Sequence, residues 1–206
     1  MLPNFAPQTT ALIVIDLQHG IVARDTAPHA AKDVVARVAR LSSRMRDAGA
    51  TIVFVRVAFS ADDRDRLKAH ADQPAPASVA DLPPEWSQLV PELGVQPSDL
   101  VITKRQWGAF YGTELDLQLR RRGIRTIVLT GISTNFGVES TGRDAWERGY
   151  EQIFVEDAMS GLSGGAHEFA ITTIFPRLGV IVSTEEVLAW DDGRPPAAGA
   201  IGPGPN

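Results

Sequence analysis

The most informative segment of this sequence, residues 130–150, reads TGISTNFGVESTGRDAWERGY. It predicts the end of a strand, a tight turn and the start of a helix that Thr134 or Asn135 can cap. Open N–H groups at a helix start can bind an anionic oxygen. An enzyme could place a nucleophile at this position, but the residue there is Gly137. A glycine there either serves the turn or leaves room for a substrate, and the spacing favours neither interpretation.

Two charged residues, Asp16 and Lys104, each follow a short apolar run, ALIVI in the first case and DLVIT in the second. Taken alone, Asp16 is more often a helix cap or turn residue, and Lys104 a solvated loop lysine. A partly desolvated carboxyl at a strand end is also where a general acid or base is expected. Burial would raise the pKa of Asp16 and a neighbouring lysine would lower it, so the two side chains can tune each other.

An aromatic loop follows Lys104 and contains Trp107, Phe110 and Tyr111 together with two glycines. A lysine beside aromatic side chains can orient an anionic or carbonyl-bearing ligand. The same aromatic cluster is equally consistent with core packing or with a subunit interface, and the sequence leaves these alternatives open.

Several kinds of site are missing from the pattern. The chain has no cysteine, which excludes disulfides, thiolate zinc sites and cysteine nucleophiles. No GxGxxG or Walker loop follows a strand, and Ser133 has no histidine in a recognisable partner position. The four histidines are scattered along the chain, at His19, His29, His70 and His167. We therefore expect no metal site and no cofactor.

Apolar periodicity predicts alternating strands and helices along nearly the whole chain. Strands are expected at 11–16, 51–57, 99–103, 125–130, 152–156 and 179–183. Helices are expected at 28–48, 113–123, 136–148 and 166–174, the second opened by a capping box of Thr113 and Asp116. The pair Glu156 and Asp157 is expected to form a turn. Residues 60–84 indicate a long loop or lid, and residues 192–206 a flexible tail.

This alternation predicts a three-layer α/β/α domain, Rossmann-like, with six parallel strands. We expect one domain spanning 1–206 with its core at about 10–190. Ligands of such sheets bind at the carboxyl ends of the strands. Asp16, Lys104 and the turn at 132–137 each follow a strand, so we expect them to converge at one edge.

Composition narrows the classes of partner. The 206-residue chain is 44% hydrophobic with a formal net charge of −5, which argues against a nucleic-acid partner. The N-terminus, MLPNFAPQTT, lacks the basic and apolar regions of a signal peptide. No apolar run approaches the length of about 18 residues needed to span a bilayer. The expected location is therefore cytoplasmic, with no membrane partner and a small molecule as substrate.

Three segments resemble the isochorismatase-like hydrolase superfamily, which includes nicotinamidases, N-carbamoylsarcosine amidohydrolases and isochorismatases. They are LIVIDLQHGIV at 12–22, VITKRQWGAFYGTELDLQLRRRGIRTIVLTG at 101–131 and ISTNFGVESTGRDAWERGY at 132–150. The resemblance covers roughly residues 10–190. It implies catalytic roles for Asp16 and Lys104, and it places the family's nucleophilic cysteine, within TNxCVxxTxRDA, at Gly137.

The resemblance also implies a cis peptide before Ser133 and an oxyanion hole formed by the amides at 133 and 137. We expect Ile132, Ser133, Phe136, Trp107 and Tyr111 to contact the substrate. The D-x-H…H metal set of nicotinamidases is lacking in the corresponding segment, VRVAFSADDRDRLKAHADQ. Relatives of this kind commonly assemble, so we expect a homodimer or homotetramer.

Isochorismatases resemble this chain in having glycine where the amidases have cysteine. They hydrolyse a vinyl ether, which needs an acid and water but no nucleophile. The resemblance therefore favours an isochorismatase-type hydrolase rather than a cysteine amidase. Two alternatives stay open, namely a hydrolase that attacks an unknown amide or ether with activated water, and a small-molecule-binding or scaffold protein whose catalysis has lapsed.

Overall fold

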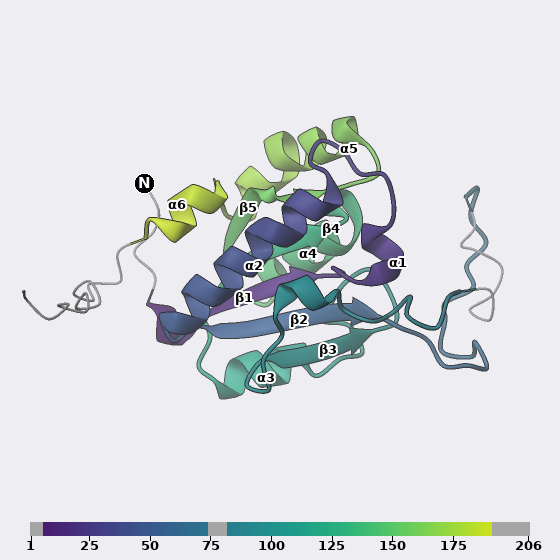
Figure 1. The fold of residues 1–206 in the computed structure, drawn as a ribbon, viewed down its shortest axis with the longest axis horizontal. Helices are drawn as coiled ribbons and strands as arrows, with labels where there is room; N and C mark the ends of the chain where they lie inside the picture. Colours follow the sequence, from purple (N-terminus) through teal and green to yellow (C-terminus); the bar gives the residue numbers. More distant parts are fainter. Residues whose placement is uncertain (1–5, 74–81, 191–206) are drawn as a thin grey trace, which may run out of the picture.

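Six parallel strands form one sheet with the order β3-β2-β1-β4-β5-β6 (Figure 1). The computed structural model describes residues 6–73 and 82–190. The strands are β1 (Thr10–Ile15), β2 (Thr51–Val57), β3 (Leu100–Lys104), β4 (Thr126–Ile132), β5 (Glu151–Ser160) and β6 (Val180–Val182). The strand order reverses between β1 and β4, and this reversal is the point where sheets of this kind bind ligands.

Helices cover both faces of the sheet. The α-helices are α1 (His19–Val22), α2 (Ala31–Asp47), α3 (Leu115–Arg121), α4 (Glu139–Glu147), α5 (Gly164–Phe169) and α6 (Thr184–Leu188). Shorter helical turns are η1 (Pro7–Thr9), η3 (Pro91–Leu93), η4 (Thr134–Val138), η5 (Ala170–Ile174) and η6 (Phe175–Arg177). Helices α2 and α6 pack on one face, whereas α3, α4 and η5 pack on the other, so the predicted three layers are confirmed (Figure 1).

The two faces of β1 show why the core divides in this way. All six of its residues are buried, as expected for a central strand of a parallel sheet. Leu12 and Val14 belong to the apolar cluster beneath α2, whereas Ile13 and Ile15 belong to the cluster on the opposite face. Alternation along the strand therefore supplies both cores, and the strand's carboxyl end is held rigidly between them.

The predicted strands and helices are present, but several boundaries differ. Helix α2 begins at Ala31 rather than at residue 28, because Pro28 belongs to the preceding loop, where its peptide bond with Ala27 is cis. The predicted helix at 136–148 starts earlier, as the π-helical turn η4 that continues into α4. The helix expected at 166–174 is divided between α5 and η5.

The predicted capping box at Thr113 is wrong. The Thr113 hydroxyl does accept a hydrogen bond from Leu115 N at 3.2 Å. The Thr113 N–H, however, donates to the Phe110 carbonyl at 3.3 Å instead of to Asp116, whose carboxylate accepts the Tyr150 hydroxyl at 2.8 Å and pairs with Arg120. A long-range partner from the connection between α4 and β5 has replaced the local one.

The predicted turn at Glu156 and Asp157 is also wrong, because β5 continues to Ser160. Phe154 pairs with Leu129, and Met159 pairs with Gly131, so the register shifts between the two pairs. The intervening residues of β5 form an irregularity that turns these acidic side chains away from the regular ladder. Glu156, within this bulge, contacts His29 and His167.

The connection between β2 and β3 carries the expected long loop, which the structure describes up to residue 73 and again from residue 82. The expected tail at 192–206 lies outside the described residues. In the described part of the chain, no helix has the length and apolar character needed to cross a membrane.

Candidate functional site

Asp16 and Lys104 meet at the carboxyl edge of the sheet, as their positions after β1 and at the end of β3 predict. Asp16 Oδ2 lies 2.7 Å from Lys104 Nζ. Because β2 lies between β1 and β3, the lysine side chain must extend across one strand to reach the carboxylate. Its ammonium also donates to the Trp107 carbonyl oxygen at 2.5 Å. The lysine side chain is 1% exposed, so it is not a solvated loop lysine.

The backbone holds Asp16 in an unusual conformation. Its φ is +53°, in the left-handed region that non-glycine residues rarely adopt. The Asp16 N–H donates to the Val55 carbonyl at 2.9 Å, which fixes the residue to the neighbouring strand β2. A non-glycine residue in this region is a reason to look for function at that position.

Burial and the lysine act in opposite directions on the pKa of Asp16. Removal from water is the larger effect, so the pKa of Asp16 is raised to about 6 although the charge and hydrogen bond of Lys104 lower it. Asp16 Oδ1 is buried and has no hydrogen-bond partner among the residues that the structure describes. This oxygen can therefore exchange a proton with a bound molecule while Oδ2 stays with the lysine.

The turn after β4 brings Gly137 to the same place. The Ile132–Ser133 peptide bond is cis, and Ser133 precedes η4 without capping it through its side chain. A Cβ atom built on Gly137 would lie 3.1 Å from Lys104 Nζ and 3.2 Å from Asp16 Oδ2. It would also lie 2.8 Å from the Ile15 side chain. A side chain at this position would therefore crowd Ile15, Lys104 and Asp16.

Gly131, in β4, makes this convergence possible. Its φ is +116°, and a Cβ atom there would lie 2.1 Å from the Ile15 carbonyl oxygen. The backbones of β1 and β4 approach so closely at this point that only glycine fits. The turn that follows β4 therefore lies directly beside Asp16.

Comparison with known proteins decides the family. The isochorismatase domain model matches residues 10–186, which is most of the chain. The isochorismatase family protein YecD of Escherichia coli O157:H7 is 52% identical over 181 residues, covering 88% of this chain and 95% of YecD. The chain belongs to the isochorismatase family.

A solved structure and a more distant relative extend this result. An isochorismatase family protein from Burkholderia thailandensis has a TM-score of 0.86 at 49% identity, covering 92% of this chain and 98% of that one. The ureidoacrylate amidohydrolase RutB of Variovorax paradoxus is 33% identical over 76% of this chain and 71% of its own length. The family's fold thus agrees with the observed sheet and helices.

A hydrogen-bond bridge ties the aromatic loop to Gly137. The Thr141 hydroxyl donates to the Gly137 carbonyl at 2.6 Å and accepts the Ala109 N–H at 3.1 Å. The loop after β3 and the turn after β4 are therefore held together by one buried threonine of α4. The motif TNxCVxxTxRDA includes Thr141, but the sequence indicated no role for it, because its contact with Ala109 joins segments far apart in the chain.

The residues expected to contact substrate occupy different environments. Trp107 and Phe136 are partly exposed, at 65% and 40%, and their rings contact each other with centroids 5.0 Å apart. Tyr111 is 73% exposed, whereas the Ile132 side chain lies in the core and leaves only its backbone for such a contact. Phe110 is a core residue that stacks on Tyr150.

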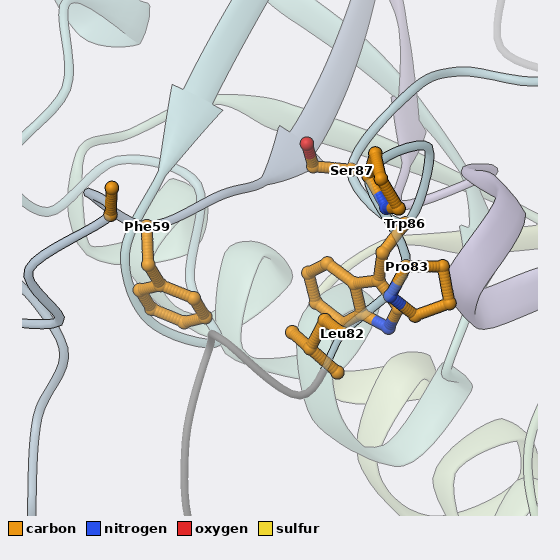
Figure 2. A pocket seen from close by; sticks show the side chains of 7 residues that line it. Phe59, Leu82, Pro83, Trp86 and Ser87 are labelled. Atoms are coloured by element: carbon orange, nitrogen blue, oxygen red, sulfur yellow. The ribbon is translucent and has the colours of Figure 1, made fainter.

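A hollow of about 360 Å³ lies beside the end of β2, between residues 59–61 and 82–87. Figure 2 shows the Phe59 ring on one side and Leu82, Pro83 and Trp86 on the other. The Gln18 side chain connects this segment to the site, because its amide donates to the carbonyl oxygens of Val57 and Trp86. The long loop is therefore anchored two residues after Asp16.

Two of the four histidines are brought together, which corrects the expectation that all four are scattered. His29 Nε2 and His167 Nε2 lie 3.1 Å and 3.2 Å from the same oxygen, Glu156 Oε1. Burial lowers the pKa of His167, and the nearby Glu156 partly offsets this effect. No spacing in the sequence indicates this cluster, because its members come from a loop, a bulged strand and a helix.

Proposed function

We propose that this chain is a hydrolase that uses Asp16 and water in place of a covalent nucleophile, with a vinyl ether of the isochorismate type as its substrate. The main support for this proposal is the contact between Asp16 and Lys104 beside Gly137. The chain contains no cysteine, so the thioester-type route of cysteine amidases is closed to it.

The reaction begins with Asp16 as general acid. Its carboxyl, whose pKa is raised to about 6, transfers a proton to the terminal carbon of the enol ether. This transfer gives an oxocarbenium ion and leaves Asp16 as a carboxylate. Water then adds to the cation and gives its proton to Asp16, and the hemiketal breaks down to a ketone and an alcohol. No bond to the protein forms at any step.

Lys104 and the turn after β4 have supporting roles. The buried ammonium keeps the carboxylate in place at 2.7 Å and offsets negative charge on a substrate carboxylate. The first N–H groups of a helix have no carbonyl partner within that helix. The amides at Ser133 and Gly137 are therefore suited to hold an anionic substrate oxygen.

The test is to incubate purified protein with isochorismate and follow pyruvate release through a coupled assay. We expect release by the wild type and a decrease of about 10²–10⁴-fold in Asp16→Asn, which keeps the shape but cannot exchange the proton. Asp25→Asn, at an exposed position of the loop before α2, is the matched control and should retain activity. No pyruvate above the Asp16→Asn background would reject this substrate.

A second candidate is hydrolysis of an amide or ether by water that the Asp16 carboxylate activates. The relative that favours it is RutB, whose name describes an amidohydrolase and which is 33% identical to this chain. A screen of ureido compounds, simple amides and enol ethers separates the two candidates. Release of ammonia without any release of pyruvate would favour the second.

A further inference from the structure

His29, Glu156 and His167 offer three metal-binding atoms from three separate segments. His29 lies in the loop between α1 and α2, Glu156 in the bulge of β5, and His167 in α5. Their ligand atoms all lie within 4.8 Å of one another. These segments differ from the one after β2, where the nicotinamidase set would lie, so this cluster is a separate arrangement.

The two nitrogen-to-oxygen distances of the cluster agree with the geometry of a bound ion, and the two histidine nitrogens lie within 4.8 Å of each other. Zinc ligands at about 2.0–2.2 Å from the ion lie about 2.9–3.4 Å from each other, depending on the angle between them. The two nitrogen-to-oxygen distances here are 3.1 Å and 3.2 Å. Two imidazoles and one carboxylate form a set that binds Zn²⁺ or other divalent first-row metals.

Backbone contacts hold the donors in this arrangement. Ala27 and Gly161 exchange two hydrogen bonds, of 2.8 Å and 3.1 Å, which join the His29 loop to the residue after β5. The Ser160 hydroxyl donates to the His29 carbonyl at 2.6 Å. The loop and the end of β5 are therefore fixed relative to each other, and a metal ion would not have to assemble the site.

The second ring nitrogen of His167 has a partner of its own. His167 Nδ1 lies 2.8 Å from the Thr134 hydroxyl, in the turn after β4. A ligating histidine commonly donates its other N–H to a neighbouring oxygen, which orients the ring. With Nε2 on a metal, Nδ1–H would donate to Thr134, so this contact suits the bound state.

The charges of the cluster are not balanced by protein cations. Within residues 6–73 and 82–190, Glu156 forms no ion pair with a lysine or arginine, and the two imidazoles are its partners. Its side chain is 35% exposed and that of His29 is 23% exposed, so an ion could enter from solvent and keep open positions for water. The alternative is a metal-free cluster in which both Nε2–H groups donate to the carboxylate.

We propose that His29 Nε2, Glu156 Oε1 and His167 Nε2 form a binding site for one divalent transition-metal ion, of which Zn²⁺ is the probe. The ion supplies the positive charge that the cluster lacks and joins the His29 loop, β5 and α5. Through Thr134, it also adjoins the turn that carries Gly137. The proposal does not depend on the proposed reaction.

The experiment measures metal binding directly. The full chain, with any histidine tag removed, is stripped with a chelator, dialysed and titrated with Zn²⁺ by calorimetry. Co²⁺ then reports the ligand set through its visible absorption. We expect one ion per chain, and an increase of the melting temperature on adding Zn²⁺, because the ion binds only the folded state.

Two variants and one control decide the outcome. His29→Gln and Glu156→Gln, both at partly exposed positions, should each weaken Zn²⁺ binding by at least about 10-fold and abolish the Zn²⁺-dependent increase in melting temperature. His19→Gln removes a histidine outside the cluster and should bind as the wild type does. Circular dichroism of each stripped variant verifies that it is folded. The absence of stoichiometric binding by the wild type, or equal binding by all variants, would overturn the proposal.

Discussion

Two groups of polar side chains lie near the carboxyl ends of the strands, and they differ in how their charges are balanced. Asp16 and Lys104 form a buried pair in which each ion has its counterion within 2.7 Å. Among the residues that the structure describes, Glu156 pairs with two imidazoles and with no lysine or arginine, and its side chain is 35% exposed. The first group thus pairs two opposite charges, whereas the second is the group for which we propose a bound cation.

The difference in charge balance indicates which chemistry each of the two groups is suited to. A closed pair in low dielectric can hold a carboxyl near its point of titration, which is what proton transfer requires. An open set of nitrogen and oxygen donors is suited to hold an ion.

Removal of one partner of the closed pair should have the largest effect. Lys104→Met leaves a buried carboxylate without its counterion, which costs about 3–5 kcal/mol of stability at neutral pH. The matched control is Lys68→Met, whose side chain is 66% exposed and pairs with Asp63 at 3.4 Å. A salt bridge made by a solvent-exposed lysine contributes about 0–1 kcal/mol. Urea unfolding of both variants measures the difference, and equal losses would contradict the contrast.

The pH dependence of kcat/KM should distinguish the two candidate reactions. With Asp16 as general acid, the protonated form is active, so kcat/KM should fall about tenfold per pH unit above the pKa of about 6. A fall of roughly 100-fold over two units is expected. If the carboxylate activates water instead, kcat/KM should rise up to about pH 6 and then level off.

The pH dependence of the protein's stability should also reflect the titration of Asp16. The pKa of Asp16 is raised from 3.8 to about 6, so the folded state holds this proton more tightly than the unfolded chain does. The stabilising contribution is fully present below about pH 4 and is lost as the pH rises through 6. The stability of the wild type relative to Asp16→Asn should decrease over that interval. A stability difference between the two proteins that does not change with pH would show that Asp16 does not titrate in this interval.

Gly137→Ala should disturb the closed pair by crowding it. The added methyl group would lie within 3.2 Å of both charged side chains and 2.8 Å from Ile15, and overpacking of this kind costs about 1–3 kcal/mol. Gly165→Ala in α5 is the matched control, because the nearest atom to its Cβ is 4.0 Å away. Thermal unfolding compares the two. By the same argument, Gly137→Cys should not gain amidase activity unless Asp16 and Lys104 separate.

The smallest effect is expected in the open cluster without metal. In a chelator, Glu156→Gln retains the size of the side chain and one acceptor oxygen, so stability should change by less than about 1 kcal/mol. With Zn²⁺ present, the wild type should gain stability and Glu156→Gln should not. A large loss of stability in the presence of a chelator would show instead that the hydrogen bonds of the metal-free cluster stabilise the fold.

Much of this molecule is predictable from the order of its residues. Apolar runs indicate the six strands, and the rule that parallel strands share a carboxyl edge predicts that Asp16, Lys104 and Gly137 converge. The prediction of a capping box at Thr113 was wrong, and Asp116 instead accepts a hydrogen bond from Tyr150, 34 residues away. The cluster at Glu156 could not be predicted, since a bulge in β5 places that side chain and no local pattern marks such a bulge.

The contact between Trp107 and Phe136 has a practical consequence. Trp107 is largely exposed, and its backbone carbonyl accepts a hydrogen bond from the Lys104 ammonium. A molecule that enters the site would change the surroundings of this ring, and hence its fluorescence. The difference spectrum between the wild type and Trp107→Phe isolates that signal from the other three tryptophans of the chain. Compound libraries can then be screened optically for ligands of this family member, whether or not the protein turns them over.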